Sequence, residues 1–286
     1  MKKLKKIIRY LFGTFIFIIL YTSSSLSPAL IFNYDKKENQ EFKKIGHRGA
    51  AGLAPENTLT AISKGLEHRV DRIEIDVQQT KDGKVILMHD LSLDRTTDAE
   101  GLVKDYTYAQ MSDFDAGNWF DAAFANEKIP TLEEAIQLIN ARAELIIEIK
   151  KGNEYYPGIE ESIINILKES NSINWCIIHS FDTKVLERIH EIAPSIRLHK
   201  LFIGKLRHLP IVVSLNNGIE TYNIDAYPYI DEYSINYNYA NKALIKKLQS
   251  KGKKVNVWTA NSQSIIDDMI ALGVDGIITD FPDKLK

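Results

Sequence analysis

Between residues 33 and 286, short apolar segments rich in β-branched residues alternate with segments whose apolar residues recur every three or four positions. The first pattern predicts buried strands and the second amphipathic helices, and their alternation is typical of a parallel sheet. Eight segments have the strand pattern: IGHRG, EIDV, LIIEIK, CIIHSF, RLHKLF, EYSINY, VNVWTA and GIITD. Eight parallel strands close a (β/α)8 barrel, so we predict one α/β domain with the TIM barrel fold over residues 33–286.

The alternative architecture is an open, doubly wound sheet. Such folds usually carry a Gly-rich phosphate turn, G-x-G-x-x-G, directly after the first strand. The first predicted strand leads into GHRGAAG, which does not match that pattern. The barrel is therefore the favoured fold.

A β-hairpin is predicted at the second strand, where EIDVQQTKDGKVILMHD has two extended arms around Lys81-Asp82-Gly83. Asp-Gly between such arms is a strong hairpin signal. A turn centred between Lys81 and Asp82 would pair Glu74 with His89, and directly paired residues lie roughly 5 Å apart. We therefore expect the hairpin to return an imidazole to the carboxylate at the end of the second strand.

The stretch after the hairpin, residues 91–130, is too long for a simple barrel loop. It is rich in aromatic residues, namely Tyr106, Tyr108, Phe114, Trp119, Phe120 and Phe124. We predict a small helical insertion beside the site.

Residues 1–32 have the pattern of a targeting segment. The start MKKLKKIIRY is basic, and the apolar run from Tyr10 to Tyr21 has about the length of a signal-peptide core. An uncleaved membrane anchor is the alternative, because residues 7–32 are long enough to span a bilayer. Either reading predicts an exported body, located in the periplasm, outside the cell, or on the outer face of the inner membrane.

Charge and cysteine content narrow the classes of partner. The whole chain has a net charge of -2, and without the five basic residues of the first 32 positions the remainder carries about -7. A body this acidic is not an obvious nucleic-acid binder, since phosphate-backbone affinity depends on clustered Lys and Arg. The single cysteine, Cys176, excludes an intramolecular disulfide and a Cys-rich zinc site. Metal cations and small diffusible substrates are the favoured partners.

Three carboxylates lie near the carboxyl ends of predicted strands. Glu74 and Asp76 are two positions apart, so their side chains leave the same face of a strand, and Glu148 and Lys150 do likewise. A barrel strand is covered on both faces, and burying a carboxylate pair is costly without a cation. Each acid alone could equally be a salt-bridged or rim residue, but three together predict a divalent ion with oxygen ligands, Mg²⁺ or Ca²⁺.

Two histidines flank this acidic cluster. His47 ends the first strand and His89 ends the hairpin, and each is followed by a charged residue. A lone histidine is more often structural, but a pair can divide general-acid and general-base roles near neutral pH. Arg48 and Lys150 add positive charge suited to an anionic substrate group. The combination predicts phosphoryl chemistry.

Several motifs together resemble the glycerophosphodiester phosphodiesterase family over nearly the whole body. They occur in order along the chain as HRGAAGLAPENT, EIDVQQTKDGKVILMHD, LDRTT, IPTLEEAI, EIK, SFD, VWTAN and GVDGIITDFP. The resemblance implies a phosphatidylinositol-phospholipase-C-like barrel with a small insertion. It also implies hydrolysis of glycerophosphodiesters to sn-glycerol 3-phosphate and an alcohol.

The resemblance also implies roles for individual residues. His47 and His89 would be the acid/base pair, with His89 preferred as the acid and His47 as the base. The divalent ion would be bound by Glu74, Asp76 and Glu148, and the phosphate by Arg48 and Lys150. Trp258 would contact substrate, although a core role is an equal alternative. We interpret Asn57, Thr279 and Asp280 as structural.

The expected substrates are glycerophosphocholine, glycerophosphoethanolamine and similar diesters. Residues 202–233 match no family motif and are expected to shape the leaving-group side. A lysophospholipase-D-like activity is one alternative, and a catalytically inactive phosphate-ligand binding module is another. The sequence leaves open whether water or the glycerol 2-hydroxyl attacks, and whether His179 contacts substrate or packs in its strand.

Overall fold

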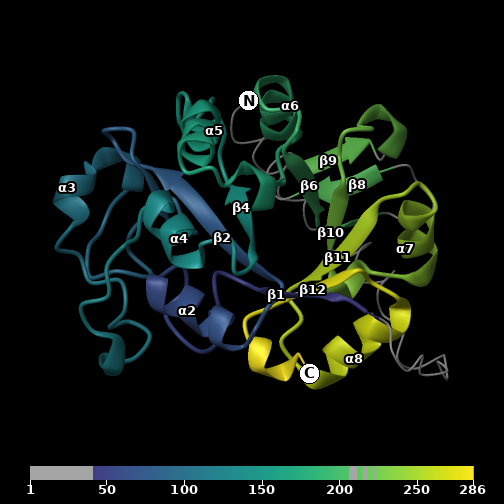
Figure 1. Ribbon diagram of the computed structural model, residues 1–286, viewed down its shortest axis with the longest axis horizontal. Coiled ribbons are helices and arrows are strands. Elements are labelled where there is room, and N and C mark those ends of the chain that lie inside the picture. Colours follow the sequence, from purple (N-terminus) through teal and green to yellow (C-terminus); the bar gives the residue numbers. More distant parts are fainter. Residues whose placement is uncertain (1–40, 206–210, 215–217, 222, 286) are drawn as a thin grey trace, which may run out of the picture.

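Eight parallel strands close into a barrel, which confirms the predicted TIM barrel fold (Figure 1). The computed structural model describes residues 41–205, 211–214, 218–221 and 223–285. β12 pairs with β1 and β1 pairs with β2, so the sheet has no open edge at this seam. Each of the eight strands overlaps one of the eight predicted segments. The strands are β1 (Lys43–Gly46), β2 (Arg72–Gln79), β4 (Glu144–Ile149), β5 (Cys176–Ser180), β6 (Arg197–Phe202), β10 (Glu232–Asn236), β11 (Lys254–Trp258) and β12 (Gly276–Thr279).

Amphipathic helices surround the barrel and bury their apolar faces against it. Most begin at a side chain that accepts a hydrogen bond from the first turn, as Thr58 and Thr131 do for α2 and α4. Thr131 and Glu134 form a capping box. The longer helices are α2 (Leu59–Glu67), α4 (Leu132–Ile139), α5 (Ile159–Glu169), α6 (Thr183–Ile192), α7 (Lys242–Gln249) and α8 (Gln263–Leu272).

The connection between β6 and β10 differs from the others. Its described residues form a three-stranded antiparallel sheet of β7 (Gly204–Lys205), β8 (Ile211–Ser214) and β9 (Gly218–Thr221). A short 3-10 helix, η5 (Ile224–Ala226), then leads toward β10. This is the stretch that matched no family motif.

The hairpin forms, but its predicted register is wrong by one residue. β3 (Val85–Leu87) pairs antiparallel with β2, with Val77 opposite Leu87. The Thr80 N–H donates to the Lys84 carbonyl at 2.9 Å, so the turn has three central residues, with Gly83 at φ 84°. The sequence-based prediction assumed a two-residue turn centred between Lys81 and Asp82, and the three-residue turn shifts the pairing by one position. Glu74 and His89 are therefore not cross-strand partners.

The stretch after the hairpin, residues 91–130, contains three short helical segments and its own apolar cluster. These segments are η2 (Val103–Asp105), α3 (Tyr108–Met111) and η3 (Ala122–Phe124). They pack around buried side chains that include Leu93, Val103 and Met111, together with Ile86 and Met88 at β3. The insertion is thus attached directly to the strand that leads to His89.

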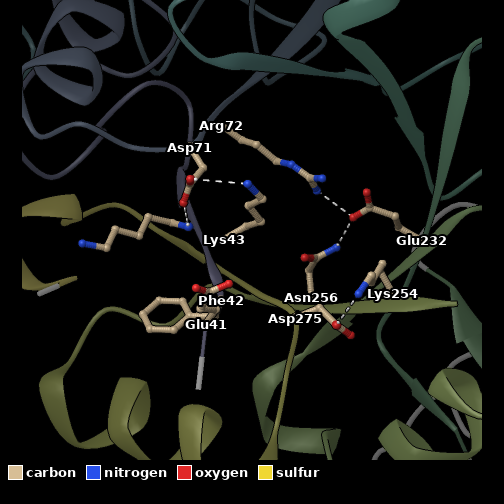
Figure 2. A pocket seen from close by; sticks show the side chains of 10 residues that line it. Glu41, Phe42, Lys43, Asp71, Arg72, Glu232, Lys254, Asn256 and Asp275 are labelled. Carbon is tan, nitrogen blue, oxygen red and sulfur yellow. Dashed lines mark hydrogen bonds and ion pairs between the residues drawn. The ribbon is translucent and has the colours of Figure 1, made fainter. Parts of the chain in front are cut away.

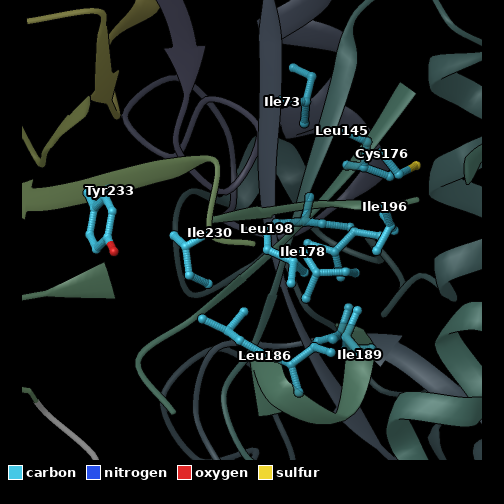
Figure 3. Close-up of a cluster of buried hydrophobic side chains, with 14 of the residues drawn as sticks. Ile73, Leu145, Cys176, Ile178, Leu186, Ile189, Ile196, Leu198, Ile230 and Tyr233 are labelled. Atoms are coloured by element: carbon cyan, nitrogen blue, oxygen red, sulfur yellow. The ribbon is translucent and has the colours of Figure 1, made fainter. Parts of the chain in front are cut away.

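The main hydrophobic core lies between the barrel and its helices. Figure 3 shows Ile178 of β5 and Leu198 of β6 near Leu186 and Ile189 of α6. Inside the barrel the apolar layer is thin and consists of Ile45, Ile146, Ile177 and Ile278. Polar side chains occupy the space on either side of this layer.

The amino-terminal end of the barrel is closed by ion pairs (Figure 2). Arg72 bridges Glu144 and Glu232, with nitrogen–oxygen distances of 2.7 Å to each. The Asn256 amide also donates to Glu232. A pocket lies at this end, lined by strand starts rather than by the predicted site residues.

Within the described residues, no helix combines the length and apolar character needed to cross a bilayer. The predicted targeting segment, residues 1–32, lies outside them.

Candidate active site

Most of the predicted site residues lie at the carboxyl ends of barrel strands or directly after them, where TIM barrels place their chemistry, whereas Glu74 and Asp76 lie within β2, which continues beyond them into the hairpin. His47 and Arg48 follow β1, and His89 follows β3. The other predicted residues lie on or directly after their strands: Glu74 and Asp76 on β2, Glu148 and Lys150 at the end of β4, and Trp258 as the last residue of β11.

The three carboxylates are buried and held beside two cations. The Lys150 ammonium lies 2.8 Å from Oδ1 of Asp76 and 2.8 Å from Oε1 of Glu148. Nε of Arg48 lies 3.3 Å from Oδ2 of Asp76. Burial and the nearby Asp76 charge raise the pKa of Glu74 to about 7. Ionisation of all three carboxylates together is therefore disfavoured unless further positive charge is present.

The pKa of Asp76 is shifted in the opposite direction to that of Glu74. Burial acts to raise the pKa of its carboxyl, but Lys150 and Arg48 outweigh burial and hold that pKa well below the ordinary value. Asn57 donates to Oδ2 of Asp76 at 2.9 Å, and the Asp76 N–H donates to the Asn57 side-chain oxygen at 3.0 Å. Asn57, interpreted from sequence as structural, thus orients a predicted ligand directly.

A group able to hold a divalent ion is present among the described residues. Glu74, Glu148 and His179 each offer one ligand atom, and these atoms lie within 4.8 Å of one another. Oε1 of Glu74 and both ring nitrogens of His179 are buried without a hydrogen-bond partner. Buried polar atoms normally have partners, so this arrangement fits a cation. The sequence left the role of His179 open. Its position near the end of a predicted strand was the one feature that indicated a functional role.

His47 forms a close pair with a residue from the far end of the chain. Its Nδ1 lies 2.6 Å from Oδ1 of Asp280, and its Nε2 lies 3.9 Å from Oε2 of Glu74. Burial acts to lower the pKa of His47, but the Asp280 hydrogen bond and nearby carboxylates raise it overall. The interpretation of Asp280 as a loop residue alone therefore missed its contact with the predicted base.

His89 has a similar carboxylate partner. Its Nδ1 lies 2.6 Å from Oδ1 of Asp90, and Nε of Arg95 lies 2.6 Å from the other Asp90 oxygen. Burial lowers the pKa of His89, and Lys150 and Arg48 add to this effect. Arg95 belongs to the LDRTT motif, so the insertion contacts the histidine through one carboxylate.

The loop after β1 is shaped by backbone conformations that few residues adopt. Arg48 has φ 48° and Asn57 has φ 58°, both in the left-handed region. The Arg48 N–H donates to Oε2 of Glu74 at 2.9 Å, while its guanidinium contacts Glu56 at 2.7 Å. Strained conformations of this kind persist where the surroundings enforce them, and they cluster at functional sites.

Trp258 occupies a position consistent with both predicted roles. Its ring packs against the inner apolar layer of the barrel and makes an edge contact with Phe181, with centroids 5.6 Å apart. Its indole N–H is buried without a hydrogen-bond partner. The ring therefore contributes to packing, and the N–H remains available as a donor.

The fold is a TIM barrel with titratable residues gathered at one end, and comparisons with known proteins identify its family. Residues 47–284 match the glycerophosphoryl diester phosphodiesterase family, and the chain belongs to it. The resemblance seen in the sequence motifs is thereby confirmed, and the protein is a glycerophosphodiester phosphodiesterase.

Alignments with named relatives extend over most of the chain. A glycerophosphodiester phosphodiesterase from Caldanaerobacter subterraneus subsp. tengcongensis is 38% identical over 244 residues, covering 84% of this chain and 95% of the relative. One from Bacillus subtilis is 33% identical over 253 residues, covering 84% and 83%. A solved Oleispira antarctica phosphodiesterase, in complex with the product sn-glycerol-3-phosphate, is 25% identical with a TM-score of 0.74, covering 84% of this chain and 94% of that one.

Proposed function

We propose that this enzyme hydrolyses glycerophosphocholine, glycerophosphoethanolamine and similar diesters to sn-glycerol 3-phosphate and an alcohol, using His47 and His89 as the acid/base pair. The observation that carries the proposal is that each imidazole is held at Nδ1 by a carboxylate, 2.6 Å away in both cases. A ring held in this way presents Nε2 for proton exchange with substrate.

The proton transfers can be followed atom by atom. One histidine takes the proton from the attacking hydroxyl. If this hydroxyl belongs to water, sn-glycerol 3-phosphate forms directly, and if it belongs to the glycerol 2-position, a cyclic phosphate forms that water then opens to sn-glycerol 3-phosphate. The bond from phosphorus to the leaving oxygen breaks as the new phosphorus–oxygen bond forms, and the other histidine gives its proton to the departing alkoxide. Asp280 and Asp90 hold the two rings while these protons move.

The remaining predicted residues would bind the charged groups. Glu74, Asp76 and Glu148 would hold a divalent ion, which when bound supplies positive charge to a phosphoryl group. Three carboxylates alone favour Ca²⁺ or Mg²⁺. Arg48 and Lys150 would bind the phosphate, with Trp258 beside the substrate.

The test measures release of glycerol 3-phosphate from glycerophosphocholine by the wild-type chain and by His47→Asn and His89→Asn. We expect both variants to lose most of the activity, whereas His68→Ala, which alters an exposed histidine at the end of α2, should retain it. Wild-type protein that binds phosphate ligands but hydrolyses none of these diesters would identify an inactive binding module instead.

The competing substrate class is lysophospholipid. Rates on glycerophosphocholine and lysophosphatidylcholine, compared at equal concentrations below micelle formation, separate the two activities. Faster hydrolysis of the lysolipid would replace the proposed activity with a lysophospholipase-D-like one.

We also propose that the enzyme works outside the cytoplasm, on the evidence of the basic start and apolar run of residues 1–32. The same segment would provide any membrane contact. Fractionation of the native host should find the protein in the periplasm, in the medium, or on the outer face of the membrane. A soluble cytoplasmic protein that keeps Met1 contradicts this proposal.

A further inference from the structure

His179 is the buried histidine of β5 that the two-histidine mechanism does not use. It is the ladder partner of Glu148 on β4, and only 2% of its surface is exposed. Neither ring nitrogen has a hydrogen-bond partner. Burying two polar nitrogens without partners costs free energy unless they bind a ligand. Packing alone therefore does not explain a histidine at this position.

The ring plane of His179 is fixed by its neighbour His199. The two imidazoles stack with centroids 4.2 Å apart and planes 16° from parallel. His199 is itself held at Nε2 by Ser234 and Asn256, each at 2.8 Å. The His179 ring is therefore oriented by packing before anything binds to it.

The ligand atoms of the two acids beside this ring lie close to it and to each other. Glu74 Oε1 is buried without a hydrogen-bond partner, and the ligand atoms of Glu74, Glu148 and His179 lie within 4.8 Å of one another. Two ligands bound to one ion at about 2.0–2.3 Å lie at most about 4.6 Å apart. A small side-chain adjustment would therefore bring the three atoms onto a common ion.

We propose that His179 is a nitrogen ligand of the divalent ion, together with Glu74 and Glu148, and that this donor set prefers a transition ion such as Mn²⁺, Co²⁺ or Zn²⁺ over Ca²⁺ or Mg²⁺. This inference rests on the proposed function only in assuming that the site holds an ion. Imidazole suits transition ions, whereas Ca²⁺ and Mg²⁺ favour oxygen ligands. Asp76, held by Asn57 and Lys150, would then be the less available carboxylate.

The direct test is spectroscopic and uses the wild-type full chain. The protein is stripped with a chelator and dialysed, and then loaded with Mn²⁺ for pulsed electron paramagnetic resonance. We expect nitrogen coupling from a bound imidazole. Its absence from the wild-type spectrum overturns the proposal without requiring any variant to fold.

Variants assign the nitrogen and measure its effect. His179→Phe keeps a flat ring against His199, and should lose the nitrogen coupling and at least about tenfold in Co²⁺ affinity by calorimetry. Its Ca²⁺ affinity should change far less. His47→Asn should keep the coupling, and coupling that disappears with His47 instead of His179 overturns the assignment. Circular dichroism of each stripped variant verifies folding.

The outcomes separate this inference from the proposed function. Nitrogen coupling in a protein without diester hydrolysis supports the His179 assignment and defeats the catalytic proposal. Diester hydrolysis in the presence of Ca²⁺, with no nitrogen coupling for any transition ion, supports the catalytic proposal and overturns the His179 assignment.

Discussion

Asp280 Oδ1 lies 2.6 Å from Nδ1 of His47, although 233 positions separate the two residues in the chain. The contact exists because β12 pairs with β1, with Thr279 opposite Gly46, so the loops after the last and first strands are neighbours. Closure of the barrel therefore supplies the predicted catalytic histidine with its carboxylate.

The first prediction tests this pair. Asp280→Asn should lower kcat by roughly 10²- to 10⁴-fold with a smaller effect on KM, because the amide no longer favours the correct imidazole tautomer. Steady-state kinetics on glycerophosphocholine measure kcat and KM separately. Asp283→Asn, an exposed acid three residues later, is the matched control and should behave as wild type. An unchanged kcat for Asp280→Asn would show that the contact only supports the loop.

The second prediction separates the roles of the two histidines. His47→Ala and His89→Ala should each lose about 10²- to 10⁴-fold on the natural diester. The double variant should be scarcely slower than the poorer single one, since both groups act in one event. Wild-type rates for both single variants would refute the two-histidine mechanism.

An activated leaving group distinguishes the acid from the base. A p-nitrophenyl ester hardly needs protonation of its leaving oxygen, so His89→Ala should recover much of its rate while His47→Ala should not. The assignment is consistent with Asp280 making His47 the more basic ring. Recovery by His47→Ala alone would exchange the two roles.

The third prediction concerns metal removal. Exhaustive chelation should abolish hydrolysis, and divalent ions should restore it. Glu74→Gln should weaken ion binding at least about tenfold, because it removes a negative charge from the site. Glu100→Gln, an exposed acid of the insertion, is the control. Full activity after chelation would eliminate the metal site from the mechanism.

The same variant should have an opposite effect on the metal-free protein. Burial and Asp76 raise the pKa of Glu74 to about 7, so its charged form is disfavoured in the fold without an ion. Without metal, the Glu74→Gln variant should therefore melt at a temperature equal to or higher than that of metal-free wild type. With a saturating concentration of the ion, wild type should have the higher melting temperature, because it gains more free energy from ion binding than the variant does. A lower melting temperature for the stripped variant would contradict this account.

The fourth prediction concerns the opposite end of the barrel. Glu232→Gln should destabilise the fold by roughly 3 kcal/mol at pH 7, since it leaves buried Arg72 with one carboxylate fewer. Burial opposes ionisation of Glu232, but Arg72 outweighs it, so the native pKa is lowered. Its stabilisation is thus complete above the unfolded pKa of about 4.3 and is lost as the pH falls through the native value.

Denaturant unfolding at several pH values measures this effect. The difference in unfolding free energy between wild type and Glu232→Gln should shrink as the pH falls below about 4.3. Glu187→Gln, on the exposed face of α6, should match wild type throughout. A difference that stays constant with pH would show that packing, not charge, accounts for the loss.

Local patterns in the sequence were sufficient to predict the barrel strands and the surrounding helices. β-Branched runs such as IIEI of β4 and the three- to four-residue periodicity of α6 each depend on neighbours within a few positions. The same locality placed His47, Glu74 and Glu148 near strand ends, where a barrel gathers its functional side chains.

The hairpin register required more than local pattern. The Asp-Gly signal predicted a turn but not its length, and the Thr80 and Lys84 backbone contact selected three central residues. A difference of one residue exchanges the faces of a strand, so Glu74 lost its predicted partner. His89 instead reaches the site through the backbone that follows β3, held by Asp90 and Arg95.

The sequence by itself determined the strands, the helices and the predicted acids and histidines, because each depends on residue type and short-range spacing. Only the tertiary structure decided the partners of those residues. Asp280 reaches His47 through closure of the barrel, and His179 meets Glu148 through the pairing of β4 with β5. Such contacts join segments far apart in the chain, and their geometry is set by strand register and packing, which no local pattern encodes.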